Sequence, residues 1–193
     1  MRCLKRVIGV VVIVLVAGII VMYSGVISVA ATNPHAPLTA YVLSTTMDNS
    51  VRYHAKDIRP PPLDDSQMVM EGFRHYRGMC AGCHLAPGME SSEIRQGLTP
   101  EPPKLQEVAA EWRPAELFWL IQNGVKMSGM PAWGPTHSDD AIWAIVAFLQ
   151  KLPGMTAQEY EAMGQAAGPG EEETEEGHDG DDAGPHGAEG AGG

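Results

Sequence analysis

Two short stretches of the sequence carry residues whose types and spacing suit metal chemistry. The first is "CAGCH", in which Cys80 and Cys83 lie three positions apart and His84 follows directly. A Cys-x-x-Cys-His motif is typical of covalent attachment of a c-type haem. Two thiols on one helical turn can each bond a vinyl group, and the adjacent imidazole can supply an axial nitrogen to the iron. The motif therefore predicts one haem c per chain, attached through Cys80 and Cys83 and ligated by His84.

The same motif has three other interpretations. A structural zinc site needs a second pair of ligands, and the remaining cysteine, Cys3, stands alone near the N-terminus. A redox dithiol is expected beside a βαβ unit, and the sequence shows no strand pattern. A chance match to so short a motif is the third possibility. We favour haem, because a large apolar macrocycle would also complete the core of a small helical domain.

The second stretch is "GVKMSGMPAWGP", residues 124–135, which offers a sixth ligand for such an iron. It holds Met127 and Met130 in a segment rich in glycine and proline. A methionine thioether raises the reduction potential of a haem and suits electron transfer. Met89 follows His84 too closely to reach the opposite face of a haem. The other two methionines that follow the motif lie after or within terminal helices: Met155 and Met163.

The elements that must position these residues are helices, and we expect an all-α domain over residues 66–167. Ser66 is suited to cap a first helix that reaches about residue 79. Pro114 suits the first turn of a second helix, which the Asn-Gly pair after "LFWLIQ" would end. Ser138 would cap a third helix, in which apolar residues fall at i, i+3, i+4 and i+7. "TAQE", residues 156–159, is a capping box that opens a final helix.

The N-terminal segment, residues 1–31, predicts a membrane anchor or an uncleaved signal. Basic residues precede an uncharged run over 7–31, and roughly 20 apolar residues suffice to span a bilayer. The positive-inside rule then keeps the N-terminus in the cytoplasm. A cleaved signal peptide is the alternative, because "SVA" (28–30) resembles a cleavage site, although the apolar run is longer than usual for a signal. Both interpretations place the rest in the periplasm or another extracytoplasmic space.

Two further segments flank the predicted domain. Residues 32–65 are proline-rich and predict a tether, extended around the three prolines at 60–62. Residues 168–193 contain nine acidic residues and no Lys or Arg, which predicts a disordered acidic tail. Without this tail the net charge would be −2 instead of −11. Because no part of the chain is strongly basic, the composition argues against nucleic-acid binding.

Together these features resemble the class I c-type cytochromes, here monohaem and membrane-anchored, over about residues 66–152. The family has a Gly-x-x-x-aromatic pair four residues ahead of its first cysteine, which Gly72 and Tyr76 match. It packs this pair against an aromatic residue of its last core helix, which Phe148 in "IVAFL" matches. The resemblance implies a small cytochrome c-like helical domain wrapped around one covalent haem.

The resemblance also implies roles for residues around the iron. "PKL" at 103–105 matches the Pro-x-Leu of the family, so the Pro103 carbonyl would accept the ring N–H of His84. "GMP" at 129–131 matches the family's Gly-Met-Pro, so Met130 would be the sixth ligand and Met127 would pack beside the haem edge. The chain departs from the family in its rim, which lacks a ring of lysines. Only three cations lie in the expected rim segments: Arg95, Lys104 and Lys126.

These features imply a one-electron carrier instead of an independent enzyme. Its partners would be redox proteins in or at the membrane, with no small-molecule substrate, and it could be the cytochrome subunit of a respiratory dehydrogenase or oxidase complex. An alternative is a haem enzyme or gas sensor with a labile sixth ligand. A third interpretation is an interaction module in which the acidic tail is the working part.

Overall fold

The computed structural model describes residues 2–168, and within that range the chain is helical and contains no strand. The elements in chain order are α1 (Arg2–Ser24), α2 (Pro37–Ala55), α3 (Ser66–His75), η1 (Tyr76–Cys80), α4 (Ala81–His84), α5 (Glu93–Gln96), α6 (Leu105–Val108), η2 (Ala109–Glu111), α7 (Pro114–Asn123), α8 (Asp139–Leu149) and α9 (Ala157–Ala167). The expected all-α fold with an N-terminal apolar helix is therefore confirmed. Apart from Gly168, the predicted acidic tail lies outside the described residues.

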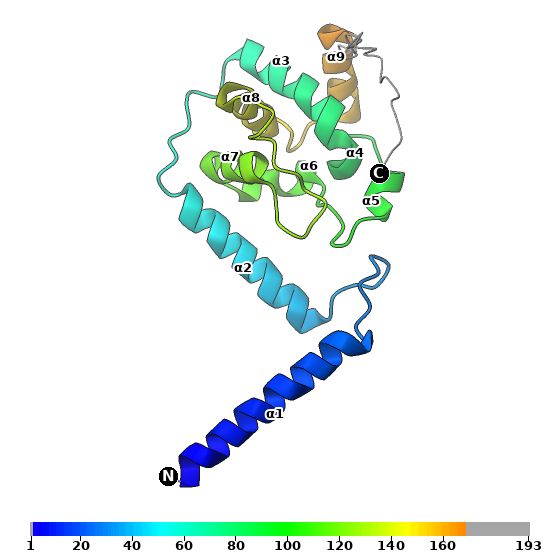
Figure 1. Ribbon diagram of the computed structural model, residues 1–193. Coiled ribbons are helices and arrows are strands. Elements are labelled where there is room, and N and C mark those ends of the chain that lie inside the picture. The colour runs from blue at the N-terminus through cyan, green and yellow to red at the C-terminus, as the bar shows by residue number, and fades with distance from the viewer. Residues whose placement is uncertain (1, 169–193) are drawn as a thin grey trace, which may run out of the picture.

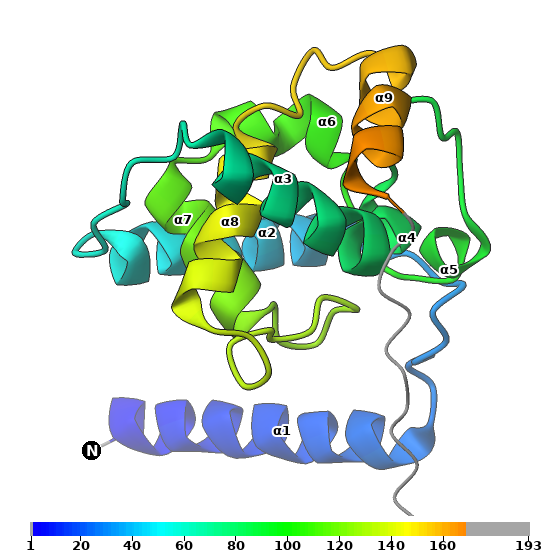
Figure 2. The ribbon, with the colours of Figure 1, turned by 90° about the horizontal axis from the view of Figure 1, so that it is seen from above.

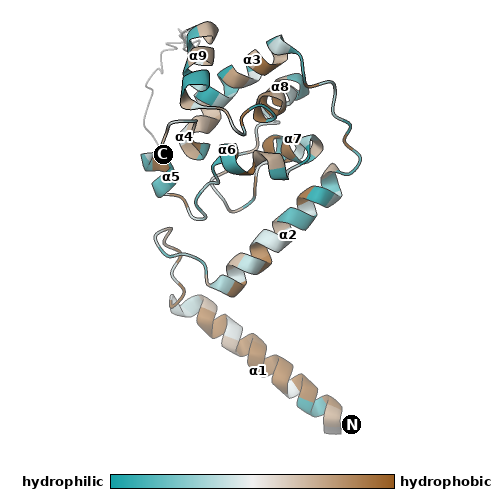
Figure 3. Ribbon diagram, turned by 180° about the vertical axis from the view of Figure 1, so that it is seen from behind, coloured by the Kyte–Doolittle hydropathy of each residue, from teal (hydrophilic) through white to brown (hydrophobic). Residues whose placement is uncertain are grey.

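The helix α1 stands apart from the rest of the molecule (Figure 1). Its stretch Cys3–Ser24 has a mean hydropathy of 2.9 and buries none of its side chains against the protein. Figure 3 shows that the residues of α1 are hydrophobic along most of its length. By length and composition α1 can cross a bilayer, so it is a candidate membrane anchor.

The helix α2 lies within the proline-rich segment 32–65, where the sequence pattern predicts a tether and no helix. Pro37 occupies its first turn, where a missing backbone N–H removes no hydrogen bond. Val51 and Ala55 are each 1% exposed because this end of α2 packs against α7. Too few residues of α2 are buried to produce a helical pattern of apolar residues in the sequence. The helix is therefore recognised only from its contact with α7.

The core of the molecule is the crossing of α3 and α8. Gly72 permits this crossing, because a Cβ at that position would lie 1.8 Å from the carbonyl oxygen of Ala144. Phe73 and Tyr76 then pack against Phe148, with ring centroids 5.5 and 5.1 Å away. All three rings are fully buried, and aromatic burial of this kind contributes strongly to folding. The contacts order the helices as α9, α3, α8, α7 and α2, and Figure 2 shows α9 against α3 on the side away from α7.

The helix starts agree with most of the sequence signals and correct one of them. Ser138 caps α8, and Thr156 with Glu159 forms the capping box of α9. The cap of α3, however, is Asp65, whose carboxylate accepts two backbone N–H groups at 2.8 and 2.9 Å. Ser66 is the first helical residue instead, because a carboxylate is a stronger acceptor than a hydroxyl. The helix also turns into the π-helical η1 before residue 79.

Candidate functional site

The predicted attachment motif lies where α3 ends. The π-helical turn η1 carries Cys80, and the single turn α4 carries Cys83 and His84. Leu85 follows with φ of 62°, so the chain turns away from the helix directly after the histidine. The hydroxyl of Tyr76 donates to the Leu85 carbonyl and holds this exit against the core. The structure therefore brings the three motif residues together at one fixed helix end.

The surroundings of the two motif thiols do not favour a redox-active pair. Both are free cysteines, and both are half-buried. Burial, together with the neighbouring Cys83, raises the pKa of the Cys80 thiol to about 12. A redox-active dithiol needs a lowered thiol pKa. A zinc site is also unsupported, since residues 2–168 hold no cluster of three His, Cys, Asp or Glu side chains placed for a metal ion.

His84 is oriented by a backbone carbonyl. Its Nδ1 lies 2.8 Å from the carbonyl oxygen of Pro103, which can only accept, so Nδ1 carries the proton and Nε2 keeps its lone pair. Burial lowers the pKa of His84; the bond to Pro103 opposes this effect, and the nearby charge of Arg95 adds to it. The ring is therefore neutral, which is the form that binds a metal. Two thiols and one neutral, oriented imidazole form a donor set that fits haem c.

The segment that carries Pro103 is braced by Arg95. The Nε of Arg95 donates to the carbonyl of Pro102 at 3.2 Å, and its guanidinium pairs with Glu101. These contacts hold the backbone at Pro102, and the next residue, Pro103, is the one whose carbonyl contacts His84. From the sequence alone, Arg95 is predicted only as a cation of the rim. An arginine bonded to a carbonyl seven residues away leaves no periodic signal by which the sequence could have shown this brace.

The two methionines of the loop between α7 and α8 differ in their exposure to solvent. Met130 is half-buried and packs against the apolar core. Its backbone N–H donates to the hydroxyl of Ser128 at 3.1 Å, and its carbonyl accepts the N–H of Val125 at 3.1 Å. Met127 has φ of 62° and is 94% exposed. The loop thus turns Met130 inward and Met127 outward, and the expectation that Met127 packs beside a haem stays a prediction.

Two glycines allow this loop to lie close to its neighbours. Gly124 ends α7 with φ of +64°, and a Cβ there would come within 2.6 Å of the backbone of Pro131. A Cβ on Gly129 would lie 2.7 Å from the side chain of Leu98. The loop is therefore held between the end of α7 and the segment that follows α5. This explains why the stretch around Met130 is rich in glycine.

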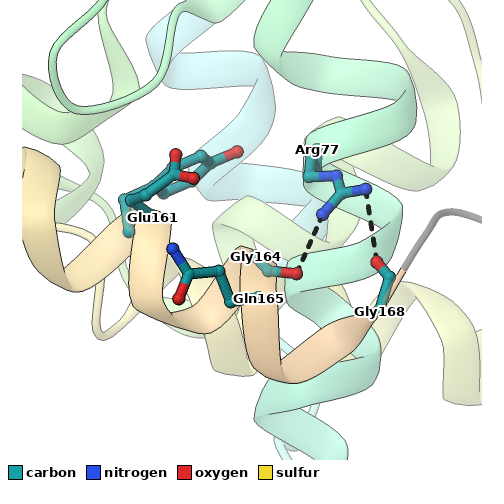
Figure 4. A pocket seen from close by; sticks show the side chains of 6 residues that line it. Arg77, Glu161, Gly164, Gln165 and Gly168 are labelled. Atoms are coloured by element: carbon teal, nitrogen blue, oxygen red, sulfur yellow. Dashed lines mark hydrogen bonds between the residues drawn. The ribbon is translucent and has the colours of Figure 1, made fainter.

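A surface pocket lies between η1 and α9 (Figure 4). Arg77 crosses it and donates to the carbonyls of Gly164 and Gly168 at 3.3 and 3.5 Å. The last carbonyls of a helix favour a cation, so this contact stabilises the end of α9. The hydroxyl of Tyr160, also in the pocket wall, is buried without a hydrogen-bond partner. We assign the pocket a role in packing α9 on the domain.

Comparison with known proteins identifies the domain. Residues 67–149 match the family described as cytochrome c oxidase, cbb3-type, subunit III. No curated protein matches the chain. The matched range runs from the first turn of α3 to the end of α8 and leaves α1, α2 and α9 outside. It contains the motif, the braced segment and the methionine loop. Residues 67–149 therefore form a class I c-type cytochrome domain, which binds one haem c covalently and transfers electrons.

Proposed function

We propose that the chain transfers single electrons through a haem that Cys80 and Cys83 attach and that His84 and Met130 ligate. When bound, the haem supplies an iron that changes between the ferric and ferrous states. The observation that carries the proposal is the contact between His84 and Pro103 beside two free thiols. It fixes one nitrogen of the imidazole and leaves the other available. The inward turn of Met130 supports a second ligand from the loop.

The residues of the chain act on electron transfer by holding a fixed geometry. The Pro103 carbonyl orients the His84 ring and increases its basicity. Met130 would contribute a neutral, polarizable sulfur that favours the reduced iron. The crossing of α3 and α8 supports one side of the site, and the loop between α7 and α8 supports the other. No side chain has to change its protonation state for an electron to pass.

We also propose a location and a setting. The N-terminus would remain in the cytoplasm, α1 would span the membrane, and the haem domain would lie on the extracytoplasmic side. The mean hydropathy of α1 and the basic residues before it support this orientation. The family description names a subunit of a cytochrome c oxidase, which supports a role as the cytochrome subunit of a respiratory oxidase or dehydrogenase complex. Its partners would be redox proteins in or at the membrane.

The spectrum of the full-length protein tests the ligation. We expect the ferric protein to show a methionine–iron charge-transfer band, and the reduced protein to bind CO slowly or not at all. A high-spin iron that binds CO at once would contradict the carrier and favour a haem enzyme or gas sensor with a labile sixth ligand. Cyanide binding to the ferric protein provides a second measurement of the same property.

The lone Cys3 tests the orientation. Because haem attachment consumes the other two thiols, a thiol reagent that cannot cross membranes reports on Cys3 alone. We expect labelling only after intact spheroplasts are lysed. Labelling of intact spheroplasts would reverse the orientation. A mature protein that lacks Cys3 would show that the segment is a cleaved signal.

A further inference from the structure

We propose that the N-terminal half of α2, residues 37–46, binds lipid at the surface of the bilayer that α1 spans. In this position it fixes how the cytochrome domain faces the membrane. The inference rests on the proposed anchoring by α1 and goes beyond it. Anchoring alone would leave the domain on a free tether, whereas a bound α2 gives the domain one orientation.

The first observation is the length of the uncharged run. From residue 7 to residue 47 the chain contains no Asp, Glu, Lys or Arg, and the first charge is Asp48. A membrane span needs only roughly 20 residues, about half of this run. The run therefore continues through the linker at 25–36 and into α2. Chain entering water usually acquires charges soon after a span, and this chain does so only in the second half of α2.

The second observation is that the two halves of α2 have opposite surroundings. Leu38, Tyr41 and Val42 are 74%, 67% and 51% exposed. They fall at i, i+3 and i+4, so they share one face of the helix. At the other end Val51 and Ala55 are buried against α7. One half of the helix thus has a protein partner, and the other half presents an apolar, uncharged surface.

The docked half makes α2 a rigid extension of the domain. The ring of His54 stacks on that of Trp119 of α7, with centroids 5.4 Å apart and planes 9° apart. Arg52 lies close enough to Glu116 of α7 to lower the pKa of that carboxyl group. The linker is also tied to the domain, because the Thr99 hydroxyl donates to the Ala31 carbonyl. What binds the free half of α2 therefore orients the whole domain.

The third observation is the direction of α2. It begins thirteen residues after the end of α1 and runs across the direction of α1 at the level of its C-terminal end (Figure 1). The cytochrome domain lies on the far side of α2. A helix that crosses the end of a membrane span lies along the bilayer surface. There Tyr41 would meet the headgroup region, which tyrosine favours, and the aliphatic side chains beside it would enter the acyl boundary.

Lipid explains these features better than a protein partner does. The apolar face belongs to the same uncharged run as the membrane span, and chain continuity keeps it within reach of the bilayer. The intervening linker exposes three further apolar side chains: Val26, Ile27 and Val29. A bilayer covers all of them at once. A protein partner would need a separate surface for the linker and for the helix.

The test uses the full-length, haem-loaded protein in nanodiscs of phosphatidylcholine and phosphatidylglycerol. With Cys3 replaced by serine, one nitroxide label is attached at a time through Leu38→Cys or Val42→Cys. Electron paramagnetic resonance then compares the access of oxygen, which enters lipid, with that of a water-soluble nickel chelate. Val14→Cys in α1 is the reference for lipid, and Asn49→Cys, exposed in the second half of α2, is the reference for water. The haem spectrum confirms that each variant folds.

We expect the ratio of oxygen to nickel access to be several-fold higher at Leu38 and Val42 than at Asn49. If Val14 is lipid-like while both positions match Asn49, the inference is overturned, although the anchor stands. The same outcome is expected if another protein normally covers this face of α2, because no such protein is present in the disc and the face would then be exposed to water. If Val14 itself is water-like, the proposed anchor fails, and with it the inference. Tyr41→Cys provides a third position on the same face.

Discussion

The two predicted ligands of the iron are held in position by different means. His84 is held by its side chain, through a 2.8 Å bond from Nδ1 to the Pro103 carbonyl, and Arg95 braces the adjoining backbone. Met130 has a thioether, which donates no hydrogen bond and accepts only weakly. Its position therefore depends on the backbone of its loop, where its carbonyl is bonded to Val125.

This difference predicts two kinds of response to substitution. On the His84 side one supporting group, the Pro103 carbonyl, touches the ligand itself, so disturbing it should alter the electronic character of the ring while the ligand stays bound. On the Met130 side the supporting groups touch only the chain. Changing these groups should alter the fraction of molecules in which the Met130 sulfur is bound to the iron, without altering the electronic character of that sulfur. The following predictions are ordered by their expected effect on the iron.

Replacing Met130 by alanine should have the largest effect. We expect the methionine–iron band to disappear and the reduction potential to fall by a substantial part of the roughly 0.8 V over which axial ligands set haem potentials. The matched control is Met127→Ala in the same loop, which should leave both quantities unchanged because that side chain is 94% exposed. Absorption spectra and redox titration measure both. Loss of the band in the Met127 variant alone would reverse the assignment.

Replacing Gly124 by alanine should displace Met130 from the iron in only part of the molecules. The new Cβ would sit 2.6 Å from the backbone of Pro131. The backbone of Gly124, with φ of 64° and ψ of −170°, is also in a region that is nearly exclusive to glycine, which alone costs another residue about 1–3 kcal/mol. We expect a mixture, in which some molecules keep the native band and others lose it. Gly154→Ala is the control, because Gly154 has φ of +80° but a Cβ there meets nothing within 4 Å. A uniform shift of the methionine–iron band, without loss of intensity, would contradict the inference that the backbone of the loop controls only whether Met130 is bound.

Replacing Arg95 by lysine should have a smaller effect, and it should change the electronic character of the His84 ring while both ligands stay bound. Lysine keeps the charge but loses the Nε donor to the Pro102 carbonyl, so the bond between Pro103 and His84 should weaken. A less basic imidazole stabilises ferric iron less, and the potential should rise. We expect a rise below about 60 mV, which corresponds to a tenfold change for one electron. The methionine band should keep its full intensity.

Glu101→Gln sharpens this test, because it removes the ion-pair partner and keeps the Arg95 donor. It should shift the potential less than Arg95→Lys does. Redox titration of the two variants, together with their urea unfolding, separates the roles. If both variants lose stability while the potential stays constant, Arg95 is only a structural residue and the brace does not act on His84.

The sequence could predict the elements whose signals are local. The caps of α8 and α9 and the motif at the end of α3 each lie within a few residues, and the structure contains them. The helix α2 could not be predicted in this way, because its stabilising contacts are with α7, about 65 residues later in the chain. The brace by Arg95 also could not be predicted, because a side-chain bond to a carbonyl seven residues away leaves no sequence pattern. The choice between Met127 and Met130 depended on a family resemblance, since their spacing alone treats them alike.

Replacing Glu116 by glutamine should leave the iron unaffected while it destabilises the protein. Glu116 lies at the start of α7, the helix that leads into the Met130 loop. Burial opposes its ionisation, but its bonds to Arg113 and the charges of Arg113 and Arg52 outweigh this, so its pKa lies below the ordinary value. Its backbone and side-chain bonds to Arg113 measure 2.8 and 2.9 Å. Charge-assisted bonds of this kind contribute about 1.5–3 kcal/mol.

The pH dependence of this destabilisation distinguishes the ion pair from packing. Because the folded pKa of Glu116 is lowered, the stability that its charge contributes is present above the unfolded pKa, near 4.5, and is lost as the pH falls through the folded value. We therefore expect urea unfolding to separate wild type and Glu116→Gln at pH 7 and to bring them together in acid. A gap that persists in acid would show that the glutamine disturbs packing instead. A change in the methionine band would show that strain at the start of α7 reaches its far end, and the backbone support of Met130 would then extend through the whole helix.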